Sequence, residues 1–154
     1  KFDSRYGEGK IASRIGLESE AILYDNPLDL FKDVKDKKSG KLGCVFVDEA
    51  QFLTKQQVAQ LCQVVDDLGI PVLAYGLRTD FLGEAFEGSL YLLLWADELI
   101  EVKTICHCGK KATMNARFDK DKKMIRSGAQ IDIGGNEKYV ALCRKHYRSG
   151  NIEK

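Results

Sequence analysis

The sequence lacks long apolar runs, a signal peptide and an excess of charge of one sign. No apolar stretch approaches the length that crosses a bilayer, so we expect no membrane partner. The formal net charge of the 154 residues is +1, which gives no support for nucleic-acid binding through bulk electrostatics. A disulfide framework is also missing, because the five cysteines are an odd number and are spaced like metal ligands with two left over. A reducing, cytoplasmic location is therefore expected.

A glycine-rich phosphate loop is absent as well. The pattern Gly-x-x-x-x-Gly-Lys-Ser/Thr occurs nowhere, and no strand pattern precedes Lys1. An α/β nucleotide site normally needs such a loop. If this chain has a nucleotide site, we expect its first strand and phosphate loop to be missing from the sequence.

The most informative stretch that is present is 44–52. Its apolar start predicts a buried strand of a parallel sheet, and the strand ends at Asp48 and Glu49. Ligands of open α/β sheets lie at the carboxyl ends of the strands. One acid there can hold a metal ion through water while the other faces a substrate, as phosphoryl transfer requires. Two acids that only end a strand are the simpler interpretation, which we favour less because acids are scarce beside buried strands.

Helical and extended patterns alternate around this stretch. The patterns predict helices over 28–34, from the Thr54 cap to Gly69 and over 88–97, and strands over 70–76, 99–103 and 112–118. The strand, helix and strand between residues 44 and 76 would form a right-handed βαβ unit. The polar, glycine-containing residues 1–16 predict a long loop, either a solvated one or one in which Arg5 clamps a phosphate and Asp3 assists.

The character of the chain changes at Thr104, so we divide it into an α/β domain (1–103) and a second domain (104–154). Two close pairs of soft ligands lie in the second part and make a complete set for tetrahedral zinc: Cys106, Cys108, Cys143 and His146. Four protein ligands leave no open position, so the zinc would be structural. His107 is a poor competing ligand because it is adjacent to both cysteines.

Several motifs occur together and in one order: Asp3-x-Arg5-Tyr6, the acidic stretch, Gly76–Phe81, the cysteine and histidine pairs, and Ile133-Gly134-Gly135-x-x-x-Tyr139. Over residues 2–148 the chain resembles the type II thymidine kinases, in their bacterial version. The resemblance implies a RecA-like, P-loop-like fold with a mostly parallel sheet and a small C-terminal zinc-ribbon lasso domain. It also implies transfer of the ATP γ-phosphate, with Mg²⁺, to the 5′-hydroxyl of thymidine for nucleoside salvage. A homotetramer and feedback inhibition by thymidine triphosphate are further implications.

The resemblance also implies roles for single residues. Glu49 matches the general base, Asp48 the acid that holds magnesium, and Asp3 with Arg5 the loop pair beside the phosphates. The remaining matches are part of the nucleotide site (Ala50, Gln51), the surroundings of thymine (Leu77, Phe81, Phe86, Asn115), the lasso that reads thymine through its backbone (Ile131, Asp132, Ile133, Gly134, Gly135) and the contact to the sugar hydroxyl (Tyr139).

The residue patterns taken alone favour simpler roles for part of this set. They predict Phe81 and Phe86 as core residues and Gly134-Gly135 as a hairpin turn. Two other functions also compete. A helicase-like ATPase core is suggested by Val-Asp-Glu-Ala-Gln, but a basic strand-binding surface and a second lobe are not visible. A zinc-ribbon binding module without activity would leave the acid-ended strand unexplained.

Overall fold

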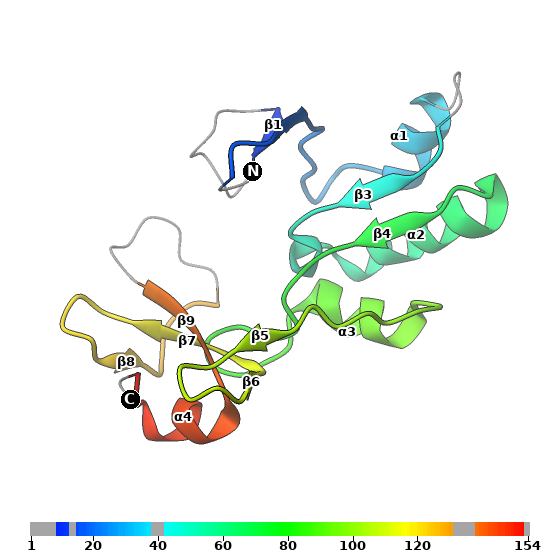
Figure 1. The fold of residues 1–154 in the computed structure, drawn as a ribbon. Coiled ribbons are helices and arrows are strands. Elements are labelled where there is room, and N and C mark those ends of the chain that lie inside the picture. The colour runs from blue at the N-terminus through cyan, green and yellow to red at the C-terminus, as the bar shows by residue number, and fades with distance from the viewer. Residues whose placement is uncertain (1–8, 13–14, 38–41, 131–137, 153–154) are drawn as a thin grey trace.

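The computed structural model describes residues 9–12, 15–37, 42–130 and 138–152, and it is a mixed α/β structure, as predicted (Figure 1). Its elements, in order, are β1 (Lys10–Ala12), β2 (Glu18–Glu20), α1 (Leu30–Lys37), β3 (Val45–Val47), the 3₁₀ turn η1 (Ala50–Phe52), α2 (Lys55–Leu68), β4 (Val72–Ala74), α3 (Glu87–Trp95), β5 (Thr104–Ile105), β6 (Lys111–Ala112), β7 (Met114–Phe118), β8 (Met124–Ile125), β9 (Lys138–Leu142) and α4 (Arg144–Ser149).

The predicted βαβ unit is present as β3, α2 and β4. The two strands pair in parallel, with Val47 opposite Ala74. Helix α2 begins at a capping box, in which the Thr54 side chain accepts from Gln57 N and the Gln57 side chain accepts from Thr54 N. It ends at Gly69, whose φ of 66° is the left-handed conformation that glycine adopts without strain. Local capping signals therefore fix both ends of this helix.

The hydrophobic core lies on one side of β3 and β4. It contains Val47, Ala50, Leu53, Val58 and Leu61, all less than a tenth exposed. The prediction of a strand buried on both faces is wrong: a neighbour of Val47 on β3, Phe46, is 69% exposed and stacks on Tyr75. Alternate side chains of a strand point to opposite faces, and no described element covers the outer face.

Two further sequence predictions are corrected by the structure. Part of the predicted loop over 1–16 is strand β1, which pairs antiparallel with β2 and joins Lys10 to Glu18 through a 3.2 Å ion pair. Each strand has only three residues and those of β2 are polar, so neither shows the apolar alternation that predicts strands. The strand predicted over 99–103 does not form. Its apolar side chains at 99, 100 and 102 are between 61% and 79% exposed, and none of the described strands pairs with it.

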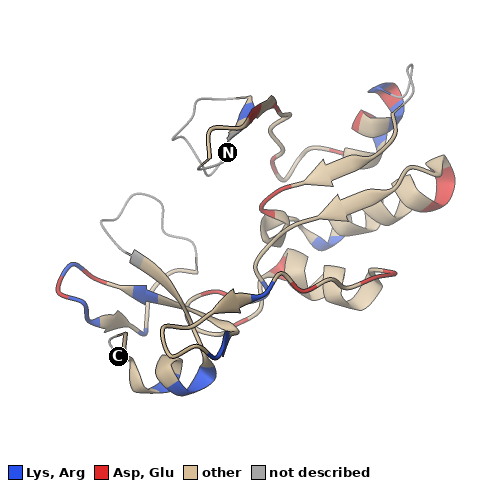
Figure 2. Cartoon of the chain, in the orientation of Figure 1, with Lys and Arg blue, Asp and Glu red and all other residues tan. Residues whose placement is uncertain are grey.

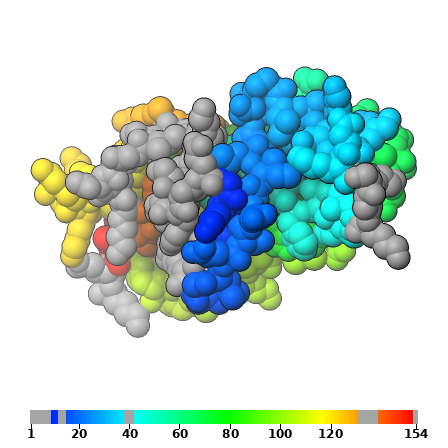
Figure 3. Space-filling view, turned by 90° about the horizontal axis from the view of Figure 1, so that it is seen from above, coloured from blue at the N-terminus to red at the C-terminus, as the bar shows by residue number. Residues whose placement is uncertain are grey.

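The C-terminal part, from residue 104 onward, is built on antiparallel strand pairing. Strand β7 lies between β8 and β9, with Asn115 opposite Ala141, and β5 pairs with β6. The strand predicted over 112–118 is thus split between β6 and β7. Seen from above, strands β1 and β2 are drawn between the α/β part and the C-terminal part (Figure 3). No helix in the described ranges is both long and apolar enough to cross a bilayer.

Gly88, the second residue of α3, lets this helix pack against the η1 turn. A Cβ atom at this position would lie 2.5 Å from the carbonyl oxygen of Ala50, 2.8 Å from that of Leu53 and 2.9 Å from that of Gln51. These are backbone atoms that cannot rotate away. We therefore expect Gly88→Ala to lower the free energy of unfolding by about 2–3 kcal/mol. Urea unfolding measures this, with Gly43→Ala as a control, since nothing lies within 4 Å of a Cβ there.

Candidate active site and metal centre

The carboxyl ends of β3 and β4 bring two segments together. Tyr75 N donates to the Val47 carbonyl at 2.8 Å, and Ala50 N donates to the Tyr75 carbonyl at 2.8 Å. Asp48 and Glu49 stand between these bonds, and both are exposed to solvent. The acids therefore lie at the edge of the parallel pair where α/β proteins bind ligands, as the sequence predicted.

Glu49 has a left-handed backbone, with φ of 52° and ψ of 36°. A side chain in this region costs about 1–2 kcal/mol, because Cβ approaches the following carbonyl group. Strained residues of this kind gather at functional sites, where the surrounding structure holds them in place. The conformation of Glu49 is thus consistent with a role beyond ending a strand.

Gln51 holds the carboxylate of Glu49. Its side chain is only 2% exposed, its Nε2 donates to Glu49 Oε2 at 2.5 Å, and its Oε1 accepts from Leu77 N at 3.1 Å. A Cβ at Gly76 would lie 2.7 Å from Gln51 Oε1, so glycine leaves room for this amide. Gln51 therefore links the acidic turn to the segment after β4.

Tyr24, which no sequence pattern singles out, also contacts this turn. Its hydroxyl donates to the Glu49 carbonyl at 2.8 Å and lies 3.3 Å from the Asp48 carbonyl. Burial, with the charges of Glu49 and Asp48, raises the pKa of Tyr24 to about 12. No motif includes Tyr24, and it is 24 residues from Asp48, so only the folded chain reveals the contact.

The loop after β4 carries three of the residues matched to the thymine site. Leu77 is 46% exposed, whereas Phe81 and Phe86 are 1% and 6% exposed. Phe86 packs edge-on against Phe52, and the Arg117 guanidinium lies 4.9 Å from the Phe81 ring centre. Both rings are thus packed as the residue pattern alone predicted, and their role as walls around thymine stays a prediction.

Several hydrogen bonds join the C-terminal part to this loop. The Tyr147 hydroxyl donates to the Phe81 carbonyl at 2.8 Å, and Asn115 Nδ2 donates to the Thr79 carbonyl at 3.4 Å. Tyr139 of β9 is 53% exposed and pairs with Arg117 of β7. Asn115 therefore lies beside the loop that carries Phe81, and its place on the methyl side of thymine stays a prediction. Asp3, Arg5 and the lasso residues 131–135 lie outside the described residues.

The four predicted zinc ligands come together in space. The ligand atoms of Cys106, Cys108, Cys143 and His146 all lie within 4.8 Å of one another. His146 Nδ1 is 3.3 Å from the Cys106 sulfur and 3.6 Å from the Cys143 sulfur, and the Cys108 and Cys143 sulfurs are 3.9 Å apart. Metal–ligand bonds of about 2.0–2.3 Å give edges of roughly 3.3–3.8 Å in a tetrahedron. The cluster can therefore bind a metal ion such as zinc.

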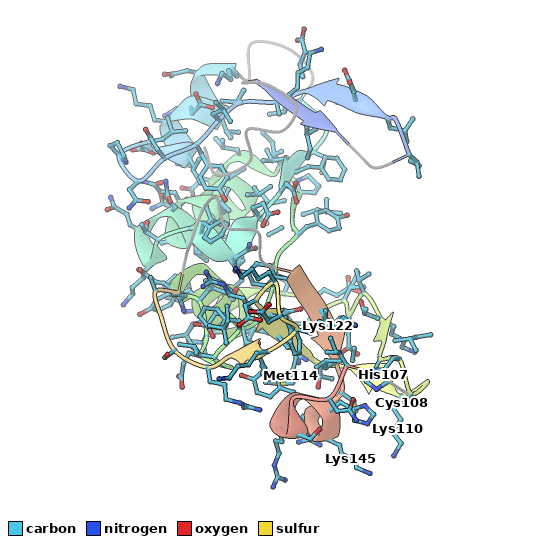
Figure 4. All side chains as sticks on the ribbon, turned by 90° about the vertical axis from the view of Figure 1, so that its left-hand side faces the viewer. His107, Cys108, Lys110, Met114, Lys122 and Lys145 are labelled. Atoms are coloured by element: carbon cyan, nitrogen blue, oxygen red, sulfur yellow. The ribbon has the colours of Figure 1, made fainter. Side chains whose placement is uncertain are left out.

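The surroundings of the cluster favour metal binding. Burial opposes ionisation of Cys106, but backbone hydrogen bonds from Cys108 and Cys143, with His146, lower the pKa of its thiol to about 6. A thiolate is the form that binds metal. His107 stacks on His146 with ring centres 4.3 Å apart, and its Nδ1 lies 3.7 Å from the Cys106 sulfur. It is not among the four residues whose ligand atoms all lie within 4.8 Å of one another. Figure 4 shows His107 and Cys108 between β5 and β6, beside α4.

Comparison with known proteins gives a consistent result. A family model described as thymidine kinase matches residues 1–147. The chain belongs to the thymidine kinase family. It is 59% identical to a thymidine kinase of Coxiella burnetii over 96% of this chain and 76% of that protein. It is 60% identical to a thymidine kinase of Rhizobium meliloti over 95% of this chain and 76% of that protein.

Membership in the thymidine kinase family decides between the competing interpretations. The match runs through both the acidic turn and the metal cluster, so the chain is an enzyme, a kinase, and not a zinc-ribbon module that only binds. A thymidine kinase needs no second lobe for a nucleic-acid strand, which removes the reason for a helicase-like assignment.

Replacing Glu49 by glycine separates stability from activity. Glycine adopts φ of 52° without strain, so we expect Glu49→Gly to leave the free energy of unfolding unchanged or to raise it by up to about 1 kcal/mol. The same change removes the carboxylate, so kinase activity should be lost. Urea unfolding and a kinase assay on one preparation measure both. A clear loss of stability would mean that the Glu49 side chain stabilises the turn.

Proposed function

We propose that this chain is a thymidine kinase that transfers the γ-phosphoryl group of ATP to the 5′-hydroxyl of thymidine. The observation that carries the proposal is about 60% identity to proteins named thymidine kinase across nearly the whole chain. The exposed carboxylates at the end of β3 supply the chemistry that this reaction needs. The products are thymidine monophosphate and ADP.

Glu49 acts as the general base in this proposal. Its carboxylate accepts the proton of the 5′-hydroxyl while the 5′-oxygen forms a bond to the γ-phosphorus and the bond to the β–γ bridging oxygen breaks. The contact from Gln51 Nε2 to Glu49 Oε2 leaves Glu49 Oε1 for the substrate. Aiming one carboxylate oxygen in this way supports efficient proton transfer, because positioning contributes most of the catalysis in phosphoryl transfer.

Charge neutralisation falls to groups beside Glu49. Asp48 is exposed at the same strand end and would hold Mg²⁺ through water, and the ion would offset the charge of the ATP phosphates. Asp3 and Arg5 would lie beside the phosphates, and Ala50 with Gln51 would border the nucleotide. Figure 2 shows acidic segments at the carboxyl end of β3, in keeping with a metal-holding role.

Thymine recognition is assigned to the loop after β4 and to the C-terminal part. Leu77, Phe81 and Phe86 would form the walls around the base, with Asn115 on its methyl side. The lasso would read the polar edge of the base through its backbone, and Tyr139 would reach the sugar hydroxyl. The bond from Tyr147 to the Phe81 carbonyl supports this assignment, because it ties the C-terminal part to the base-binding loop.

The proposal includes a larger setting for the chain. The parallel βαβ unit with acids at its carboxyl edge is consistent with a RecA-like, P-loop-like domain over 1–103, followed by a zinc-stabilised lasso domain over 104–154. A homotetramer is consistent with exposed apolar side chains such as Leu94, Ile100 and Val102. Feedback by thymidine triphosphate and a cytoplasmic location complete the proposal, and the free cysteines are consistent with that location.

A coupled assay of ADP formation by the intact protein tests this function. We expect ATP turnover that requires thymidine and Mg²⁺, with thymidine monophosphate as the second product by mass spectrometry. The mass of the intact protein is measured on the same sample, so that the turnover is assigned to a chain of known length. Turnover stimulated by single-stranded nucleic acid, and not by thymidine, would replace the proposal with a helicase-like ATPase.

A further inference from the structure

The strained turn at Glu49 is held from two sides. Gln51 binds the carboxylate, and the backbone carbonyl of Glu49 accepts two hydrogen bonds: one from Phe52 N at 3.0 Å and one from the Tyr24 hydroxyl at 2.8 Å. A carbonyl oxygen has two lone pairs, so these two donors satisfy it completely. Tyr24 is the partner that comes from a distant part of the chain.

Tyr24 is itself fixed in place. Its ring packs against the core cluster that contains Val47, Ala50 and Leu53. The carbonyl of the next residue, Asp25, accepts a 2.7 Å hydrogen bond from Gln57 Nε2, and Gln57 is only 1% exposed. The segment that carries Tyr24 is thus anchored to α2, so its hydroxyl is presented to the turn in one orientation.

The Tyr24 hydroxyl remains a donor over the whole range of assay conditions. Its pKa is raised to about 12 by burial and by the charges of Glu49 and Asp48. The phenol therefore stays protonated under ordinary assay conditions, so it does not act as a base near neutral pH. Its contacts leave it the role of holding the backbone that carries the two acids.

We propose that Tyr24 is a positioning residue for phosphoryl transfer, whose hydroxyl holds the Asp48–Glu49 backbone so that the Glu49 carboxylate is aimed at the acceptor hydroxyl. This inference rests on the proposed kinase function. Tyr24 acts through the carbonyls of Glu49 and Asp48, at 2.8 and 3.3 Å, and not through substrate. Removing the hydroxyl should leave substrate affinity nearly unchanged and slow the chemical step.

Tyr24→Phe in the intact protein tests the inference, because phenylalanine keeps the ring packing. We expect kcat to fall about three- to tenfold, the effect of one hydrogen bond, with KM values for thymidine and ATP changed less than twofold. The shape of the pH profile should not change. Tyr91→Phe is the matched control, since the Tyr91 ring packs against the same core cluster. Its kcat should equal that of the wild type.

Hydrogen–deuterium exchange of the peptide over 45–53 gives a second readout that does not need activity. Tyr24→Phe should speed exchange there at least about threefold, and Tyr91→Phe should not. Unchanged exchange with an unchanged kcat would overturn the inference, and so would an equal loss of kcat in both variants. A wild-type protein without thymidine-dependent turnover would instead refute the proposed function, while exchange would still report whether Tyr24 holds the turn.

Discussion

Glu49→Gln is expected to lower kcat for thymidine phosphorylation by about 10²–10⁴-fold, the contribution of a general base. Glutamine keeps the length of the side chain and can still contact Gln51, but it cannot accept the proton of the 5′-hydroxyl. The KM for thymidine should change little, because the carboxylate does not contribute to binding the base. Steady-state kinetics with thymidine and ATP varied separately measure both parameters.

The control for this prediction is Glu98→Gln. Glu98 is an exposed acid after α3 with no contact to Asp48, Glu49 or Gln51 among the described hydrogen bonds, so the variant carries the same charge change outside the acidic turn. Its kcat should equal that of the wild type. If Glu49→Gln kept more than a tenth of the activity, another residue would have to serve as the base, and Asp48 would be the first candidate.

The sequence predicted the frame of the site well where local signals determine the structure. The Thr54 cap and the stop at Gly69 were predicted from residue types alone, and α2 begins and ends there in the structure. The acid-ended strand and the metal cluster were also predictable, since spacing brings Cys106 and Cys108 together and the strand pattern places the acids.

The details that the sequence could not provide depend on contacts between distant segments. Tyr24 reaches a turn 24 residues away, and the close approach at Gly88 depends on how α3 packs on η1. The strand predicted over 99–103 has the right composition but no partner strand in the described part of the chain. Pairing and packing partners, unlike caps, are set by the whole fold.

Loss of the metal is expected to have the largest effect on stability. The C-terminal part has strands of two to five residues, a helix of six and a small buried core, so it has little other support. We expect Cys106→Ser to abolish binding of one equivalent of zinc and to lower the free energy of unfolding of this part by about 5 kcal/mol or more. Limited proteolysis should then cut within 104–152.

Cys62→Ser is the control, because Cys62 lies on α2, outside the metal cluster. It should keep one equivalent of zinc and the wild-type protease pattern. Cys106→Ser should also raise the KM for thymidine, since the Tyr147 bond to the Phe81 carbonyl joins the metal-held part to the base-binding loop. If Cys106→Ser kept zinc and full protease resistance, the cluster would not be the structural metal site. A normal KM despite zinc loss would mean that the loop holds its shape without the metal.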